Sequence, residues 1–447
     1  MAQLRLKDWS DIGAGRRPEM LQFCRDVARV IQGEVSPFVQ ISEAVETEMS
    51  GPLAGLPYAA KDMFLSPGRK PSWGLAEPLG SLPETKKADV LCRLDKAGAR
   101  RVGFTRMTTL AYEPSGINPL QGAACNPWNR DFAPGASSSG SAVAVASGAT
   151  FVALGSDTGG SLRIPAQGCG ITAWKPTHGF VSDMGAMPLA PSLDTIGLLA
   201  RSARDILSVA PILSGQLGQR KPNLRPASIA IISDALEGSH PAVRSCCEAA
   251  LEAMRTIGHM LEARTGLDLI NNGGSEALTV MQAEAAKTHE QRLDDANLDT
   301  VLVRRLRKGF EIKGAKLEAS LKRRADLLKK AHDEIFGVSN MIALPVMPIR
   351  TPPLSETDPT SPGFAPRTLY AFSTYSRFVN YLGLPAIALP VGFDDRGMPV
   401  ALQLIGRRGS DLDLLSTAAT FQTATDWHGR LPATLQPVAD IYGDLLS

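Results

Sequence analysis

Residues 135–165, GASSSGSAVAVASGATFVALGSDTGGSLRIP, decide the fold, because they join two serine- and glycine-rich loops through one apolar segment. The stretch holds seven serines and six glycines but no histidine. A largely buried segment tolerates so many hydroxyls only if several of them have hydrogen-bond partners. Clustered glycines mark places where the backbone turns tightly or another group approaches closely. The stretch therefore predicts two loops held in fixed register beside a ligand.

A flexible linker is the alternative interpretation of either loop taken alone. The residues between the loops, 142–154, are mostly small and apolar, which is typical of a buried helix or strand. A buried connecting element excludes the linker interpretation.

Three motifs taken together resemble the amidase signature family of serine amidohydrolases. They are the lysine motif GLPYAAKD (residues 55–62), the first serine loop GASSSGS (135–141) and the second serine loop GSDTGGSLRIPA (155–166). Lys61 lies 76 residues before Ser137, and Ser137 lies 24 residues before Ser161. This order and spacing match the family, and the combination is highly specific.

The residues themselves point to a lysine as the catalytic base. A serine nucleophile needs a base, which is usually a histidine. The six histidines are scattered, and none lies in either serine loop. Lys61 follows the apolar residues 53–60, which should carry it into the interior. Burial disfavours the ammonium form, so we expect a lowered pKa and an available neutral amine.

The resemblance implies a role for each catalytic residue. Ser161 attacks the carbonyl carbon, and its proton passes through the Ser137 hydroxyl to the Lys61 amine. The same route returns the proton to the leaving nitrogen. In the family the peptide bond at the Ser137 position is usually cis. The oxyanion is held by backbone N–H groups, expected here from Thr158, Gly159, Gly160 and Ser161.

The resemblance implies roles for four further residues near the site. Asp157 and Arg163 match a structural ion pair of the family, with a role in substrate binding as the less favoured alternative. Ser138 is expected to be structural as well. Ala111 falls where some relatives offer a backbone contact to substrate; an ordinary structural loop is the equally weighted alternative there.

The first serine loop departs from the family pattern at two positions. Ala136 and Ser139 replace common glycines. Neither change removes a catalytic atom, so we interpret both as tuning of the loop.

The composition of the chain argues against several classes of protein. A formal net charge of +2 gives no global attraction to nucleic acid or membrane, and no apolar run is long enough to span a bilayer. The N-terminus lacks the apolar core of a signal peptide, so we expect a cytoplasmic protein. The six cysteines show no zinc-type spacing, so we expect no zinc site. They are Cys24, Cys92, Cys125, Cys169, Cys246 and Cys247. The resemblance to serine amidohydrolases implies no metal or organic cofactor.

The resemblance implies a single-domain α/β/α sandwich around a large, twisted, mostly parallel mixed sheet. We expect a helical N-terminal arm over residues 1–50, with an amphipathic helix over 19–48, and the amidase signature domain over 51–447. The core signature covers about 55–205, and a variable, mostly helical region covers about 276–336. Further helices are expected at 88–97 and 241–258. Strands are expected at 101–105, 225–233, 341–346, 386–391 and 400–405, and residues 65–83 and 352–366 are expected to be loops.

Two other patterns have ordinary explanations. Residues 168–173, GCGITA, match a dinucleotide-binding pattern, but they directly follow a loop instead of a strand. The basic cluster within 304–330 is interpreted as a solvated helix face, with a nucleic-acid patch as the alternative.

Three functions are considered. The first is a free-standing hydrolase of a small carboxylic amide, ester or carbamate (urethane), with no nucleic acid or membrane partner and with a homodimer left open. The second is the amidase subunit of a transfer-RNA amidotransferase, which needs partner subunits. The third, a catalytically silent scaffold, is disfavoured because Lys61, Ser137 and Ser161 occur together.

Overall fold

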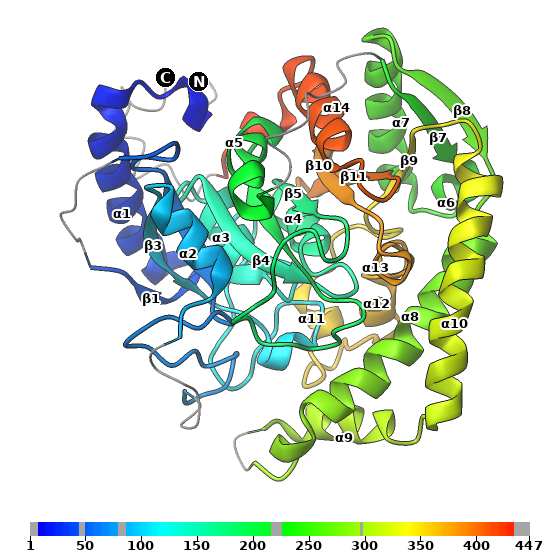
Figure 1. Cartoon of the computed structure of the whole chain (residues 1–447), viewed down its shortest axis with the longest axis horizontal. Coiled ribbons are helices and arrows are strands. Elements are labelled where there is room, and N and C mark those ends of the chain that lie inside the picture. Colours follow the sequence, from blue (N-terminus) through cyan, green and yellow to red (C-terminus); the bar gives the residue numbers. More distant parts are fainter. Residues whose placement is uncertain (1–7, 44–49, 79–85, 216–225, 296–297, 433–447) are drawn as a thin grey trace.

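The protein is built on one eleven-stranded sheet (Figure 1). The computed structural model describes residues 8–43, 50–78, 86–215, 226–295 and 298–432. The strands are β1 (Phe38–Ile41), β2 (Pro57–Lys61), β3 (Arg100–Thr105), β4 (Val152–Asp157), β5 (Thr172–Lys175), β6 (Thr195–Ala200), β7 (Ser228–Ile232), β8 (Met260–Arg264), β9 (Met341–Pro345), β10 (Ala386–Phe393) and β11 (Pro399–Gly406). Their order in the sheet is β1-β3-β2-β4-β6-β5-β10-β11-β9-β7-β8.

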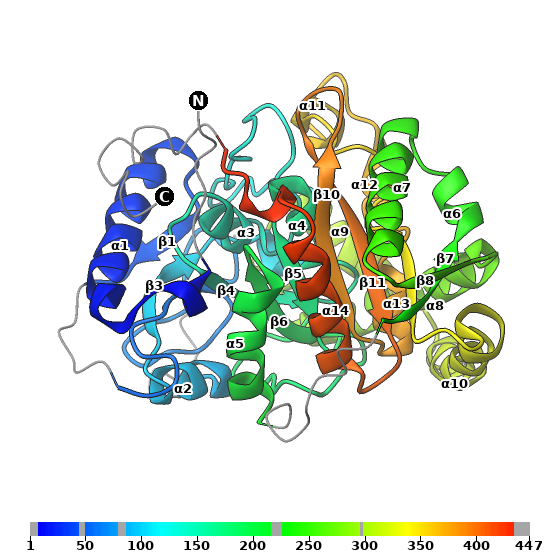
Figure 2. The ribbon, with the colours of Figure 1, turned by 90° about the horizontal axis from the view of Figure 1, so that it is seen from above.

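Helices lie on both sides of this sheet (Figure 2). They are α1 (Arg17–Glu34), α2 (Asp89–Lys96), α3 (Ser139–Ala146), α4 (Arg163–Cys169), α5 (Ala203–Ser214), α6 (Ser233–Glu237), α7 (Pro241–Thr256), α8 (Leu267–Thr288), α9 (Thr300–Gly309), α10 (Gly314–Lys330), α11 (Leu354–Thr357), α12 (Pro366–Ala371), α13 (Arg377–Leu382) and α14 (Asp411–Thr423). Helices α3 and α4 pack on each other and on the middle strands, and α5 packs with α14. The predicted α/β fold on a large mixed sheet is confirmed.

The strand directions differ from the prediction in one respect. Six of the ten pairings among the described strands are antiparallel, so the sheet is mixed but not mostly parallel. The parallel pairs lie toward the two ends of the sheet, where β2 pairs with β3 and β4 and where β7 pairs with β8 and β9. In the middle, β10 and β11 are joined by the short turn 394–398, and so short a connection requires an antiparallel pair.

The N-terminal segment is helical for a shorter length than predicted. Helix α1 ends at Glu34, and β1 then pairs antiparallel with β3 at the edge of the sheet. Pro37 lacks a backbone N–H and disfavours the helical conformation of the residue before it, so the helix cannot continue. The part of that prediction covering residues 44–48 lies outside the described residues.

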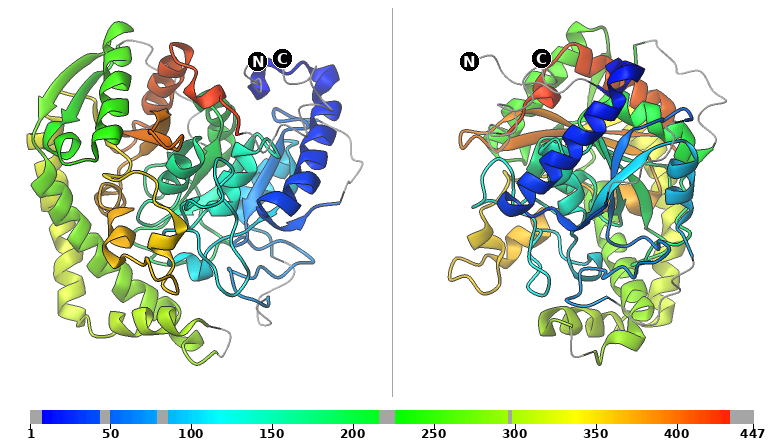
Figure 3. Two further views of the ribbon diagram at one scale, coloured as in Figure 1. Left: turned by 180° about the vertical axis from the view of Figure 1, so that it is seen from behind. Right: turned by 90° about the vertical axis from the view of Figure 1, so that its left-hand side faces the viewer.

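The variable region forms a separate wing of long helices (Figure 3). Helices α8 and α10 lie side by side, and α9 packs against α8. A second apolar cluster, which includes Ile270, Val280 and Phe378, lies between this wing and the sheet. The wing therefore rests on α13 and places α9 near the loops that follow the central strands.

The other predicted helices and strands are found within three residues of their expected bounds, whereas residues 79–83 of the predicted loop 65–83 and residue 225 lie outside the described residues. The helices at 88–97 and 241–258 are α2 and α7, and the five predicted strands are β3, β7, β9, β10 and β11. The proline-rich segment 352–366 contains the short helix α11. None of the helices in the described part of the chain combines the length and apolar character needed to cross a membrane.

Candidate active site

The site is built where β2 and β4 end side by side. These strands are parallel neighbours, with Ala60 opposite Leu154. Because parallel strands present their carboxyl ends at the same edge of a sheet, the residues that follow them meet there. Lys61 is the last residue of β2, and the second serine loop begins within β4 and continues into α4.

Lys61 is the buried amine of this site. Its side chain is 0% exposed, and its Nζ lies 2.7 Å from the Ser137 Oγ and 2.8 Å from the Ser156 Oγ. Burial lowers the pKa of Lys61 to about 7, against the opposing effect of the carboxylates of Asp194 and Asp157. A substantial fraction of the amine is therefore neutral at pH 7, as burial predicts.

The first serine loop is tied to the second by Ser138. The Ser138 N–H donates to the Ser161 carbonyl oxygen at 3.3 Å, and its hydroxyl donates to the Ser156 carbonyl oxygen at 3.2 Å. Gly155 leaves room for this contact, since a Cβ there would lie 2.7 Å from the Ser138 Oγ. The Ser138 contacts therefore join the two serine loops. The Ala136–Ser137 peptide bond is cis, in agreement with the resemblance.

Ser161 lies in the turn between β4 and α4 and lines a cavity of about 270 Å³. Thr158, Gly159 and Ala111 line the same cavity. Ala111 has a φ of +59°, and the preceding Leu110 has a φ of +49°. Two consecutive non-glycine residues in the left-handed region are uncommon, and such conformations concentrate at functional sites. The structure therefore brings Ala111 to the cavity beside Ser161.

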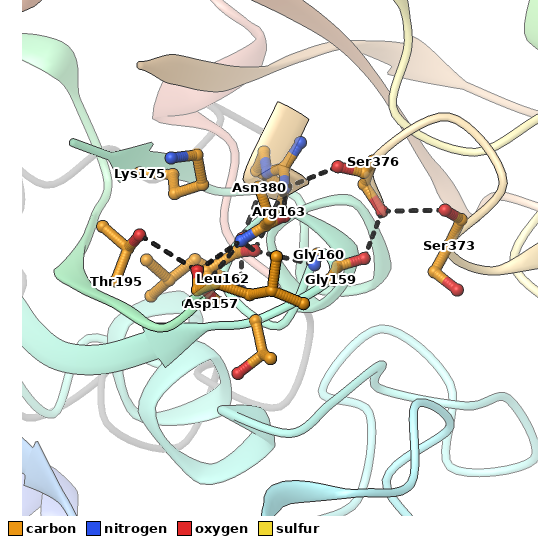
Figure 4. Close-up of polar contacts among 12 residues, drawn as sticks. Asp157, Gly159, Gly160, Leu162, Arg163, Lys175, Thr195, Ser373, Ser376 and Asn380 are labelled. Carbon is orange, nitrogen blue, oxygen red and sulfur yellow. Dashed lines mark hydrogen bonds and ion pairs between the residues drawn. The ribbon is translucent and has the colours of Figure 1, made fainter. Parts of the chain in front are cut away.

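A buried ion pair between Asp157 and Arg163 fixes the second serine loop (Figure 4). Arg163 holds the Asp157 carboxylate through Nε at 3.1 Å and Nη2 at 3.0 Å. Burial alone would raise the pKa of Asp157, but Arg163, helped by Lys175 and Asn380, outweighs burial and holds this pKa at about 2. The guanidinium also donates to the Asn380 Oδ1 at 2.7 Å and the Gln403 Oε1 at 2.9 Å. These contacts support a structural role for the Asp157–Arg163 pair.

The same carboxylate affects the predicted oxyanion hole. The Gly160 N–H donates to the Asp157 Oδ1 at 2.7 Å, so it is already engaged. Gly160 has a φ of +130°, and a Cβ there would lie 2.3 Å from the Ser376 Oγ. Gly160 therefore shapes the loop. The N–H groups of Thr158, Gly159 and Ser161 remain as the predicted donors to the oxyanion.

The structure adds residues that the sequence analysis did not single out. Ser156 contacts Lys61, and its place inside the second serine loop was an available signal. Asn380 lies 223 residues after Asp157, and its amide donates to the Asp157 carboxylate at 2.9 Å. Ser376 donates to the Gly159 carbonyl oxygen at 2.6 Å (Figure 4). No local pattern in the sequence marks these last two contacts.

The polar groups at the centre of the site are hydroxyls and an amine. Among the residues that the structure covers, no group of three or more His, Cys, Asp or Glu side chains is arranged to hold a metal ion. The central groups are the hydroxyls of Ser137, Ser156 and Ser161 and the amine of Lys61.

Comparisons with known proteins agree with this geometry. The chain is 33% identical over 432 residues to a glutamyl-tRNA(Gln) amidotransferase subunit from Methylococcus capsulatus, with 86% of each chain covered. It is similar to a solved amidase at 29% identity and a TM-score of 0.80, covering 90% of this chain and 96% of that one. The solved structure of the corresponding amidotransferase subunit from Thermotoga maritima is similar at 27% identity and a TM-score of 0.80, covering 94% of this chain and 95% of that one.

The model of the Amidase family matches residues 39–415. This match includes the lysine motif and both serine loops. The chain therefore belongs to the amidase (amidase signature) family.

Proposed function

We propose that this chain hydrolyses a carboxylic amide through an acyl-enzyme on Ser161. The observation that carries the proposal is the buried Lys61 amine, 2.7 Å from the Ser137 hydroxyl, in a loop that is hydrogen-bonded to Ser161 beside a cavity. A buried amine with a lowered pKa, beside a serine hydroxyl and close to a second serine loop, has no evident structural use.

The proposed reaction moves a proton between Ser161, Ser137 and Lys61. The Ser161 Oγ attacks the carbonyl carbon, its proton moves to the Ser137 Oγ, and the Ser137 proton moves to the Lys61 Nζ. Collapse of the tetrahedral intermediate breaks the C–N bond, and the proton returns by the same route to the leaving nitrogen. Water then attacks the acyl-enzyme by the same relay, which releases the acid and restores Ser161.

Backbone N–H groups stabilise the oxyanion in this proposal. Those of Thr158, Gly159 and Ser161 are the candidates, and the Asp157–Arg163 pair holds the loop that carries them. Preorganised donors of this kind contribute about 3 kcal/mol each to transition-state stabilisation. Esters and carbamates present the same carbonyl to the same nucleophile, so they belong to the same proposal.

A second candidate places the same chemistry in the amidase subunit of a tRNA-dependent amidotransferase. The curated relatives support this setting better than a free-standing hydrolase, because glutamyl-tRNA(Gln) amidotransferase subunits match the chain at 30–33% identity over most of its length. The solved amidase at 29% identity supports the free-standing setting. The two settings share the role of Ser161 and differ in the need for partner subunits.

The test compares the wild-type protein with Ser161→Ala on an aryl amide, an aryl carbamate and an aryl ester. We expect Ser161→Ala to abolish turnover of every substrate that the wild type cleaves, by about 10³-fold or more, while circular dichroism shows an unchanged fold. Substantial residual hydrolysis by the variant would exclude Ser161 as the nucleophile.

A further inference from the structure

The cavity beside Ser161 has an excess of positive charge. Its lining includes the cationic side chains of Arg305, Lys308 and Arg377. Glu113 contributes the one carboxyl group among the described lining residues. Arg305 and Lys308 come from α9, whereas Arg377 begins α13. Cations from two separate helices therefore converge on the space where a substrate would lie.

Arg377 lines the cavity next to the loop of the proposed nucleophile, and no ion pair neutralises its charge within the described structure. Its Cγ lies 3.4 Å from the position of a Cβ on Gly159, two residues before Ser161. Its Nη1 donates to the Ser373 hydroxyl at 3.2 Å, while its buried Nε has no hydrogen-bond partner. Burial lowers the pKa of Arg377 only to about 10, so the guanidinium stays charged at neutral pH.

Glu113 does not neutralise this charge. Its carboxylate accepts hydrogen bonds from the backbone N–H groups of Ser115 at 2.8 Å and Gly116 at 3.0 Å. Burial raises the pKa of Glu113, which opposes its ionisation, although Arg305 has a weaker opposite effect. The Glu113 carboxyl group is thus hydrogen-bonded within its own loop. The described cavity therefore offers no free carboxylate to a ligand ammonium.

A partly buried cation without a counter-ion is unfavourable, and a ligand anion would relieve it. Arginine binds carboxylates with particular strength because its planar fork donates two parallel hydrogen bonds. We propose that this cavity selects an amide substrate that carries a carboxylate and no ammonium group, with Arg377 as the principal residue that binds the carboxylate. This inference rests on the proposed function, since it names the substrate class of the same site.

Binding to the Ser161→Ala protein tests the inference without requiring turnover. Glutaramate, pentanamide and L-glutamine form a matched set, because pentanamide replaces the carboxylate by a methyl group and L-glutamine adds only an ammonium. We expect calorimetry to show glutaramate binding about 10- to 100-fold tighter than pentanamide, the range of a charged hydrogen bond. We also expect it to bind tighter than L-glutamine.

A second pair, 4-acetamidobenzoate and acetanilide, places the carboxylate on the amine side of the amide. A preference for the anion in either pair supports the inference and tells which side of the scissile bond enters the charged region. Equal affinity within both pairs would overturn it. Tighter binding of L-glutamine than of glutaramate would also overturn it and would favour the amidotransferase setting.

Variants then assign the effect to Arg377. In the Ser161→Ala background, Arg377→Gln should reduce the preference for the anion about tenfold or more, and Arg377→Lys should restore part of it. Arg307→Gln is the matched control, because Arg307 is exposed on α9 and pairs with Asp294 outside the cavity. An undiminished preference in Arg377→Gln would remove Arg377 from the assignment. If the anion binds but wild-type protein cleaves no amide, the proposed function fails while the binding inference stands.

Discussion

Lys61 shows how burial alone changes what a side chain can do. An exposed lysine is protonated at pH 7 and cannot accept a proton. Inside the sheet, Lys61 is surrounded by hydroxyls, and desolvation lowers its pKa to about 7. A second buried lysine, Lys175, has its pKa lowered to about 7 by burial and by the nearby Arg163. Only Lys61 contacts a serine of the first serine loop, so the two lysines can be distinguished experimentally.

The first prediction is a pH profile. Below about pH 7 the Lys61 amine is protonated and cannot act as a base, so kcat/KM should rise about tenfold per pH unit and level off above pH 7. Steady-state kinetics from pH 5 to 9 would measure this limb. Lys175→Met should keep the limb if Lys61 causes it. A flat profile, or a limb that disappears in Lys175→Met, would contradict the assignment of Lys61 as the base.

At the residue scale, the sequence predicted what lies in contiguous motifs. Lys61, Ser137 and Ser161 occupy three short motifs with characteristic spacing, and the structure brings the first two within 2.7 Å. Arg377 and Asn380 could not be found in this way, because their roles depend on contacts with residues more than 200 positions away. Long-range contacts of this kind follow from the topology of the sheet and have no local signal.

At the element scale, the turn from β4 to α4 depends on a charge that lies inside the protein. Asp157 and Arg163 are both fully buried, and the carboxylate accepts the N–H groups of Gly160 and Leu162. Removing one member of a buried pair leaves the other charge without a partner. The pair should therefore matter for the shape of the loop as well as for the stability of the fold.

The second prediction concerns Arg163→Met. It should lower the free energy of unfolding by about 3–5 kcal/mol, because Asp157 would remain buried without its counter-ion. Chemical denaturation at pH 7 would measure the loss. Arg204→Met is the control: Arg204 pairs with Asp8 and Asp11 on the surface, so its removal should cost about 0–1 kcal/mol. Equal losses in the two variants would contradict the structural role of the buried pair.

The elements that the sequence misjudged share a physical cause. The apolar residues after Glu19 have helical spacing. This spacing does not reveal that β1 pairs with β3 as an edge strand of the sheet. The direction of the central strands likewise depends on which strands become neighbours in space. By contrast, α2 and α7 have clear helical periodicity and were predicted within two residues of their bounds, and the variable region was predicted as mostly helical.

At the scale of the whole molecule, the basic helices of the wing are partly balanced by neighbouring acids. Lys322 pairs with Glu318, Arg323 with Glu276, and Lys329 with Asp333. These exposed pairs add little stability, but they reduce the local excess of charge. The arrangement fits the interpretation of a solvated helix face better than that of a continuous nucleic-acid patch.

The last prediction is that the purified chain is active without partner subunits. The described chain alone supplies every group that the proposed mechanism uses, namely the lysine, both serines, the Asp157–Arg163 pair and the cavity. Ammonia release from glutaramate, measured beside Ser161→Ala and with the molar mass determined by light scattering, should show turnover by a monomer or homodimer. Adding the other subunits of a bacterial amidotransferase should change the rate less than about twofold. An inert chain that gains activity only with those subunits would establish the amidotransferase setting, because the missing element would then be an ordering of the site that only a partner supplies.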